Sequence, residues 1–247
     1  MPSTIELKVK RQDSPGSPSR WEEFSLPFRP NMNVISCLME IQRRPVTRQG
    51  TSTSPVVWEC SCLEEVCGAC TMLVNGRVRQ SCTALVDQLE QPIRLAPMTR
   101  FPVIRDLVVD RKRMFENLIR VKAWVSIDGT HALGPGPRIP EKEQLAAYPF
   151  TQCMTCGCCT EACPQFNDRS GFIGPASIGQ VRLFNAHPTG RMNAEERLEA
   201  VMGEGGISVC GNAQNCVEVC PKKIPLTEAI AAVGRQVTLQ LFRELFG

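Results

Sequence analysis

Cysteine is the residue that most constrains this chain, which has 14 of them among 247 residues, most in three short runs. Such a density points to disulfides, bound metal or redox chemistry. Residues 1–13 alternate like a strand and lack the apolar core of a secretory signal, and no run of about 18 apolar residues is present. We therefore expect a cytoplasmic chain with reduced thiols, which favours metal binding over disulfides.

The first part of the chain, residues 1–102, has the pattern of an α+β domain. Residues 5–9 alternate between apolar and polar side chains as in a strand, and residues 21–28 can pair with them. Asn33 can cap a helix that follows it, and residues 91–97 have the pattern of a last strand. Strands around one helix, together with a cysteine-rich loop, predict the first domain.

The second part, residues 103–247, is expected to be an all-α domain. A helix that opens at Pro102 would carry an apolar stripe as far as Ile119. A connection rich in glycine and proline follows at residues 128–140. Further helices are predicted over residues 177–185, over residues 194–202 and along a C-terminal stretch with Ile230, Val233, Val237, Leu241 and Leu245 on one face.

Composition excludes several classes of function. Hydrophobic residues make up 43% of the chain, which is enough for a packed core. The formal net charge of +3 comes with no basic and aromatic stripe, so no nucleic-acid partner is expected. There is no Ser/His/Asp set and no glycine loop for phosphate, so we assign no catalytic residue and look to the cysteine runs for the chemistry.

The first run predicts a [2Fe–2S] site. Cys62, Cys67 and Cys70 have the C-x4-C-x2-C spacing of a plant-type ferredoxin loop. Asn75-Gly76 is a strong signal for a hairpin, which would return Cys82 to the loop as the fourth ligand. A structural zinc site is the alternative, but such sites favour paired C-x2-C units.

The second and third runs form an internal repeat. Residues 153–164 read CMTCGCCTEACP and match the bacterial ferredoxin run C-x2-C-x2-C-x3-C-P, whose fourth cysteine serves the other cluster. Residues 210–221 read CGNAQNCVEVCP, with Ala213 in place of the second cysteine. The exchange rule assigns Cys153, Cys156, Cys159 and Cys220 to a [4Fe–4S] cluster, and Cys163, Cys210 and Cys216 to a second cubane. Because an iron without a thiolate is easily lost, we predict that the second cubane is [3Fe–4S].

Three cysteines fall outside these ligand sets. Cys37 lies on an apolar helix and is interpreted as a core residue. Cys60 breaks the spacing of the first run and is interpreted as a packing residue or as a thiol beside the site. Cys158 is out of register with the second run and is interpreted as a bystander.

With these motifs the chain resembles the iron–sulfur subunits of succinate:quinone oxidoreductases, the succinate dehydrogenases and fumarate reductases. The resemblance covers nearly the whole chain and includes residues 104–107 (IRDL) and 172–175 (FIGP). Residues 182–188 (RLFNAHP) and 210–216 (CGNAQNC) resemble the menaquinone-linked branch with a two-haem anchor. The resemblance to this family implies a plant-type ferredoxin-like (β-grasp) domain followed by an all-α bacterial-ferredoxin-like domain.

The resemblance also implies a mechanism and partners. A partner flavoprotein would oxidise succinate at its FAD, and electrons would pass singly through [2Fe–2S], [4Fe–4S] and [3Fe–4S] to quinone, with haem b and the quinone site in a membrane anchor. The chain would then lie on the cytoplasmic face of the inner (plasma) membrane, held by the anchor subunit. A quinol:fumarate reductase subunit and a freestanding multicluster ferredoxin are the alternatives.

One part of the family pattern is missing from this sequence. Ubiquinone-linked members have a tryptophan shortly after the Cys-Pro of the second run, whereas residues 165–169 read QFNDR here. A histidine that follows the first cysteine of the third run in those members is Gly211 here. We therefore assign no quinone ligands.

Overall fold

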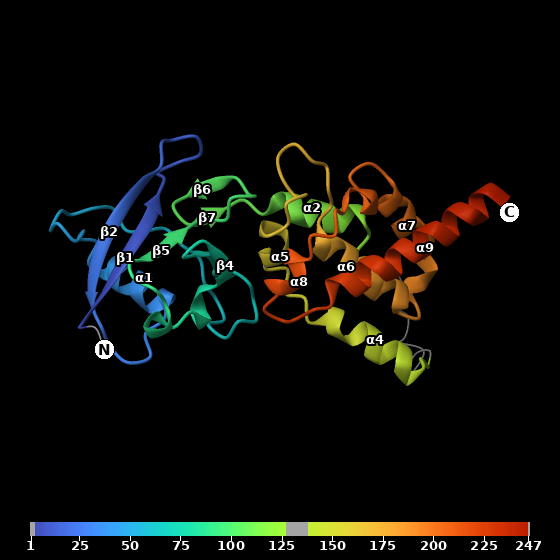
Figure 1. The fold of residues 1–247 in the computed structure, drawn as a ribbon, viewed down its shortest axis with the longest axis horizontal. Helices are drawn as coiled ribbons and strands as arrows, with labels where there is room; N and C mark the ends of the chain where they lie inside the picture. Colours follow the sequence, from blue (N-terminus) through green and yellow to red (C-terminus); the bar gives the residue numbers. More distant parts are fainter. Residues whose placement is uncertain (1–2, 127–137, 247) are drawn as a thin grey trace. The chain divides into compact units, whose positions relative to one another are not determined.

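The computed structural model describes residues 3–126 and 138–246 (Figure 1). The chain divides into two compact units, of which one comprises Met1–Arg111 and Met154–Glu161 and the other Lys112–Cys153 and Ala162–Gly247. The domain boundary predicted between residues 102 and 103 stays a prediction. Most of the connection predicted at residues 128–140 lies outside the described residues.

A five-stranded mixed sheet forms the first unit. Its strands are β1 (Thr4–Arg11), β2 (Arg20–Pro27), β3 (Thr71–Val74), β4 (Arg77–Gln80) and β5 (Ile93–Ala96), in the order β2-β1-β5-β3-β4. Strands β1 and β5 are parallel, and the other pairs are antiparallel. Helix α1 (Val34–Arg43) and the short 3-10 helices η1 (Ser81–Thr83) and η2 (Val86–Gln88) complete the unit, together with α5 (Cys158–Glu161). The predicted α+β class is confirmed.

Alternation along β1 decides which face of the sheet is buried. Ile5, Leu7 and Val9 are buried in one core with the apolar side of α1, while the residues between them face the other way. Asn33 caps α1 as predicted, because its side chain accepts a hydrogen bond from the backbone N–H of Ser36 at 2.8 Å. The predicted strands and the predicted helix of this unit are present.

The helix predicted from Pro102 to Ile119 is wrong over its first half. Strands β6 (Val103–Arg105) and β7 (Val108–Val109) form a hairpin there, and helix α2 begins only at Lys112 and ends at Arg120. The turn contains Asp106, which is fully buried and adopts a left-handed φ of 46°. Its carboxylate accepts hydrogen bonds from Arg11 Nε at 2.9 Å and from the Val57 N–H at 2.9 Å, so contacts distant in sequence override the helical periodicity.

Helices make up most of the second unit, as predicted. They are α2, α4 (Glu141–Thr151), α6 (Pro175–Ala186), α7 (Ala194–Met202), α8 (Asn215–Glu218) and α9 (Leu226–Phe246), with 3-10 turns η3 (Gly190–Asn193) and η4 (Ile207–Val209). Helix α6 packs against α4 and α9, and α7 packs against α9 (Figure 1). Within the described residues, none of the helices combines the length and the apolar character that a bilayer crossing requires.

The C-terminal helix α9 buries only part of its predicted apolar face. Val233 and Val237 are buried, but Leu241 and Leu245 are 44% and 73% exposed. The last turns of α9 therefore leave part of this face uncovered by the rest of the second unit.

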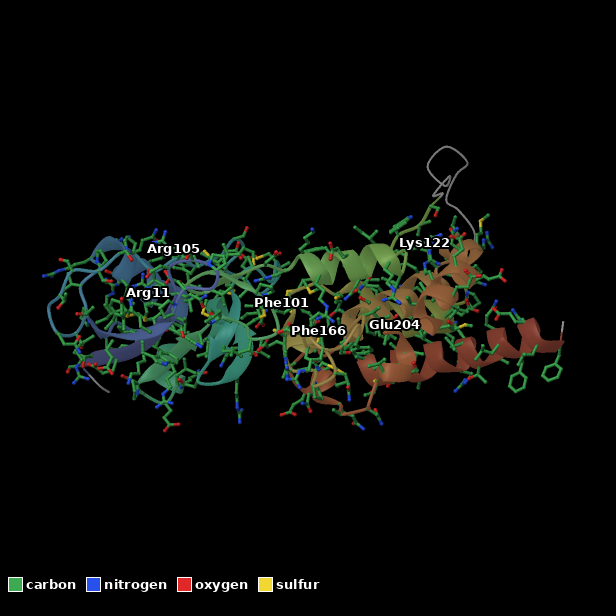
Figure 2. The ribbon with its side chains drawn as sticks, turned by 90° about the horizontal axis from the view of Figure 1, so that it is seen from above. Arg11, Phe101, Arg105, Lys122, Phe166 and Glu204 are labelled. Atoms are coloured by element: carbon green, nitrogen blue, oxygen red, sulfur yellow. The ribbon has the colours of Figure 1, made fainter. Side chains whose placement is uncertain are left out.

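Buried arginines organise both units. In the first unit, the Arg11 side chain, labelled in Figure 2, is fully buried. It is ion-paired with Asp106. In the second, the Arg113 guanidinium lies 4.0 Å from the centre of the Phe166 ring and donates to the carbonyl of Asn167 at 2.8 Å. Arg197 is buried as well and donates to the carbonyls of three residues, Lys122, Trp124 and Gly190. Buried cations of this kind hold loop backbones in place because each N–H needs an acceptor.

Candidate iron–sulfur sites

The hairpin of β3 and β4 brings the four cysteines of the first predicted site together. Cys70 immediately precedes β3, and Cys82 lies in η1, which follows β4. The pairing of Thr71 with Gln80 returns the chain to its starting point, as the Asn75-Gly76 turn predicts. Besides burial, the nearby Cys70 and Cys62 sulfurs raise the pKa of Cys82, so these three thiols lie close together, and the Cys67 N–H donates to Cys62 Sγ at 3.3 Å.

The loop around Cys62 suits a negatively charged sulfur. The Cys62 Sγ accepts hydrogen bonds from the backbone N–H groups of Glu64 at 3.4 Å, Val66 at 3.3 Å and Cys67 at 3.3 Å. These hydrogen bonds lower the pKa of Cys62 to about 7, which favours the thiolate that a metal cluster requires. By contrast, burial raises the pKa of Cys82 to about 11. The donor set fits a four-thiolate cluster bound by an amide-lined loop.

Cys37 and Cys60, which lie outside the predicted ligand sets, differ in how far they are buried. Cys37 is fully buried on α1, as predicted, and burial raises its pKa to about 12. Cys60 is exposed, so its interpretation as a packing residue is wrong. Burial and the nearby sulfurs of Cys67, Cys82 and Cys62 raise the pKa of Cys60, which places it beside the first site.

The four cysteines predicted to share the [4Fe–4S] cluster are divided between the two units. Cys156 and Cys159 are part of the first unit, whereas Cys153 and Cys220 are part of the second. Their grouping therefore rests on the sequence spacing.

Cys158 contacts a predicted ligand, although its position in the sequence gives no sign of this. It is fully buried, and its thiol donates a hydrogen bond to the Cys156 sulfur. That hydrogen bond, with help from the positive charge of Arg111, lowers the pKa of Cys156 to about 7. Cys158 is therefore more than a bystander, because it supports the charged form of a neighbouring ligand.

Close backbone packing joins the first cysteine loop to Cys156 within the first unit. A Cβ added at Gly68 would lie 2.7 Å from both Cα and Cβ of Cys156, and Gly68 has a φ of +74°. Only glycine meets both requirements without strain. The first cysteine loop therefore contacts Cys156, one of the ligands predicted for the second site, through Gly68.

Gln80, in strand β4, also connects the two cysteine loops and was not identified from the sequence. Its Oε1 accepts from Cys70 Sγ at 3.5 Å, and its Nε2 donates to Thr71 Oγ1 at 2.7 Å and to Cys158 Sγ at 3.5 Å. No motif singles out a glutamine two residues before a ligand, so only the packing reveals it.

The three cysteines predicted for the last cluster line one hollow in the second unit. Cys163, Cys210 and Cys216 surround it, and Ala213 belongs to the same wall. Its cavity volume is about 20 Å³, so the surrounding side chains lie close together. Burial raises the pKa of Cys216, and the nearby Cys163 and Cys210 sulfurs raise it further, so the three thiols lie close together. A three-thiolate cluster fits this donor set, with Ala213 where a fourth ligand would stand.

Gln165 lies against the residue that replaces the family's histidine. A Cβ added at Gly211 would lie 2.8 Å from the Gln165 side-chain nitrogen, and both residues line the hollow. The space beside Cys210 is thus filled by an amide. No quinone ligand is assigned there.

Among the described residues, no group of three or more His, Cys, Asp or Glu side chains is arranged to hold a single metal ion. Iron–sulfur clusters differ from single-ion sites because their thiolates are distributed over two or more iron atoms.

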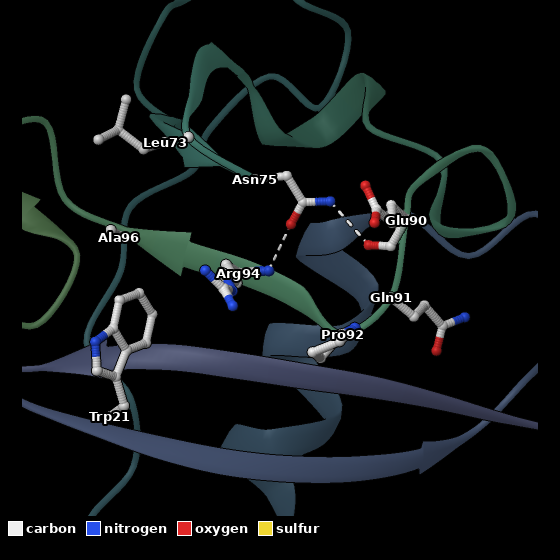
Figure 3. Close-up of a pocket in the computed structure, with 9 residues that line it drawn as sticks. Trp21, Leu73, Asn75, Glu90, Gln91, Pro92, Arg94 and Ala96 are labelled. Atoms are coloured by element: carbon white, nitrogen blue, oxygen red, sulfur yellow. Dashed lines mark hydrogen bonds between the residues drawn. The ribbon is translucent and has the colours of Figure 1, made fainter.

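A larger hollow on the outer face of the sheet contains no cysteine among its lining residues (Figure 3). It lies beside Trp21 and Arg94, which pair with Lys10 and Lys8 on the face opposite the core. The Asn75 side chain donates to the Glu90 carbonyl at 2.8 Å and accepts from the Arg94 N–H at 2.7 Å (Figure 3). These contacts anchor the hairpin turn to β5, which is a structural role.

Comparisons with known proteins agree with this arrangement. Residues 6–116 match the model of a 2Fe-2S iron–sulfur cluster binding domain, and residues 149–224 match that of a 4Fe-4S dicluster domain. The chain is 63% identical to the succinate dehydrogenase iron–sulfur subunit of Bacillus subtilis, covering 99% of this chain and 96% of that protein. It is 27% identical to the fumarate reductase iron–sulfur subunit of Wolinella succinogenes, over 94% of this chain and 97% of that protein.

A solved structure has the same fold. The Mycobacterium smegmatis Sdh1 complex in the apo form contains a chain that matches with a TM-score of 0.80 at 22% identity, covering 98% of both chains. The family models together span most of the sequence, and the Bacillus relative is similar from end to end. The chain belongs to the family of succinate dehydrogenase iron–sulfur subunits.

Proposed function

We propose that this chain carries electrons one at a time from the FAD of a partner flavoprotein, which oxidises succinate, to quinone in a membrane anchor. The single observation that carries the proposal is the full-length similarity to a succinate dehydrogenase iron–sulfur subunit at 63% identity. The fumarate reductase relatives are more distant, which favours succinate oxidation over the reverse direction.

Eleven cysteines are proposed as the cluster ligands. Cys62, Cys67, Cys70 and Cys82 would hold [2Fe–2S]; Cys153, Cys156, Cys159 and Cys220 would hold [4Fe–4S]; Cys163, Cys210 and Cys216 would hold [3Fe–4S]. The thiol contacts of the first set and the hollow lined by the third support these groupings. The second set rests on the ferredoxin spacing.

When bound, the clusters supply one-electron redox chemistry, and no bond of the substrate is made or broken on this chain. The protein's own groups hold and tune the sites. Three backbone N–H groups stabilise the negative charge of the Cys62 thiolate by hydrogen bonds, and Gly68 lets the first loop approach Cys156 closely. Cys158 and Gln80 contact ligand sulfurs and so influence their charge.

The proposed partners are an FAD-containing flavoprotein and a cytochrome b type anchor with haem b. The proposed acceptor is menaquinone, because residues 182–188 and 210–216 resemble the menaquinone-linked branch of the family. The chain would be held by its anchor at the cytoplasmic face of the inner (plasma) membrane.

Low-temperature EPR of air-oxidised native membranes tests the proposal. An oxidised [3Fe–4S] centre is paramagnetic, whereas oxidised [2Fe–2S] and [4Fe–4S] centres are silent. We expect a signal that disappears when succinate is added. A chain that purifies alone without flavin, and whose clusters ignore succinate, would instead be a freestanding ferredoxin.

A pair of neighbouring cysteines tests the first ligand set. Cys62→Ala is expected to abolish the [2Fe–2S] signal of the reduced complex, because the loop loses the sulfur that three N–H groups surround. Cys60→Ala, two residues away and exposed, should retain the signal at full strength. EPR spin counts on the reduced complex measure both, and loss of the signal in the Cys60 variant alone would contradict the assignment.

A further inference from the structure

Arg111 is a cation held largely inside the first unit. Its side chain is only 15% exposed, although it is charged. The guanidinium donates through Nη1 to the Gly68 carbonyl at 2.9 Å and through Nη2 to the Ala69 carbonyl at 2.8 Å. The nearest carboxylate oxygen of Glu59 is 4.0 Å from Nη2, and the buried Nε has no hydrogen-bond partner. Its positive charge is therefore weakly neutralised.

The two carbonyls belong to the loop that joins two proposed [2Fe–2S] ligands, Cys67 and Cys70. The Gly68 carbonyl and the Ala69 N–H are the two ends of one peptide group. That Ala69 N–H donates to Cys67 Sγ at 3.4 Å. Arg111 is thus connected to a ligand sulfur by two hydrogen bonds in series through one polarisable peptide, and such chains strengthen each other.

The loop that contains Gly68 also lies against Cys156, in the second cysteine run. Gly68 packs directly on the backbone of Cys156, a proposed ligand of the second cluster. The loop that Arg111 holds therefore contacts ligands of two proposed clusters.

We propose that Arg111 is a positioning residue that raises the reduction potential of the [2Fe–2S] cluster, through its charge and through the Gly68–Ala69 peptide to the Cys67 sulfur. This inference rests on the proposed function and deepens it. Reduction adds negative charge to the cluster, and a nearby cation and stronger N–H hydrogen bonds to sulfur both stabilise the reduced form. Without Arg111 the first cluster would accept electrons from the flavoprotein less readily.

EPR-monitored redox titration of the intact complex tests the inference. Arg111→Gln is expected to shift the one-electron equilibrium of [2Fe–2S] about tenfold toward the oxidised form, equivalent to a fall of about 59 mV. Arg111→Lys keeps a charge but cannot reach both carbonyls with one planar group, so we expect a shift of about threefold. Arg43→Gln is the matched control, because Arg43 belongs to the same unit, is 68% exposed and pairs with Glu40; its variant should leave the potential unchanged.

The outcomes separate this inference from the proposed function. If wild-type complex lacks the three clusters or ignores succinate, the proposed function fails. If the wild type behaves as proposed and the potential of Arg111→Gln equals the wild-type value, only the role of Arg111 is refuted. Should Arg111→Gln fail to retain the cluster, Arg111→Lys decides the question, and an unchanged potential in that variant overturns the inference.

Discussion

Replacing Ala213 with cysteine is expected to remove most of the paramagnetic signal of the oxidised complex. Ala213 occupies the position of the second cysteine in the third run and lines the hollow formed with Cys163, Cys210 and Cys216. A thiolate there would supply the missing fourth ligand, so the cluster would retain its fourth iron and become a [4Fe–4S] centre that is silent when oxidised. We also expect a changed potential at this site and slower succinate-driven quinone reduction, since potential depends on cluster type.

The control for this prediction is Ala213→Val, which adds volume at the same position but no ligand. It should leave the oxidised signal in place. EPR of the oxidised and the reduced complexes, with iron content per chain, measures both variants. An Ala213→Cys complex with the full oxidised signal and unchanged iron content would contradict the assignment of the three-thiolate site.

The second prediction concerns the buried Arg11–Asp106 ion pair: we expect Asp106→Ala to lower the free energy of unfolding strongly. Both side chains are fully buried, and the Asp106 carboxylate accepts from Arg11 Nε and from the backbone N–H groups of Gln12 and Val57. Asp106→Ala removes the fully buried carboxylate partner of Arg11, which keeps its ion pair with Glu22, and leaves two N–H groups without an acceptor. Removing one member of a buried ion pair costs about 3–5 kcal/mol of unfolding free energy.

The matched control is another aspartate paired with an arginine in the same unit. Asp13 pairs with Arg20 at 2.7 Å, but the two side chains are 55% and 43% exposed. Asp13→Ala should therefore leave the free energy of unfolding nearly unchanged. The measurement is the temperature at which the heated complex loses its [2Fe–2S] signal, which we expect to fall for Asp106→Ala by about 10 °C or more. If the two variants lost the [2Fe–2S] signal at the same temperature, the buried pair would stabilise the unit no more than the exposed pair does.

Several local features could be predicted from sequence because they depend on neighbours in the chain. Asn33 and Ser36 form the cap of α1 within one turn. Asn75-Gly76 adopts the positive φ values that a tight hairpin needs. Ala194–Met202 is helical over the predicted residues. In each case the deciding interactions span only a few residues, so the pattern carries the information.

The β6–β7 hairpin shows where this reasoning stops. Apolar spacing after Pro102 favours a helix, but the structure places a hairpin there because Asp106 binds Arg11, which is 95 residues away in sequence. The stripe predicted for the same segment stays partly uncovered, with Phe115 50% and Ile119 64% exposed. Asp106 and Arg11 come together only in the folded state, and no pattern among neighbouring residues predicts their ion pair.

For the candidate sites, the sequence by itself predicted the number and kind of ligands, because thiolates that share a cluster must follow a narrow spacing on short loops. It also predicted that Ala213 leaves one corner of the last cluster without a thiolate. Only the tertiary structure decided what surrounds the sulfurs: Arg111 on the Gly68–Ala69 peptide, Gln80 between Cys70 and Cys158, and the contact of Gly68 with Cys156. These groups come from distant segments, and the tuning of a cluster depends on charge and hydrogen bonds in space, which the order of residues alone does not specify.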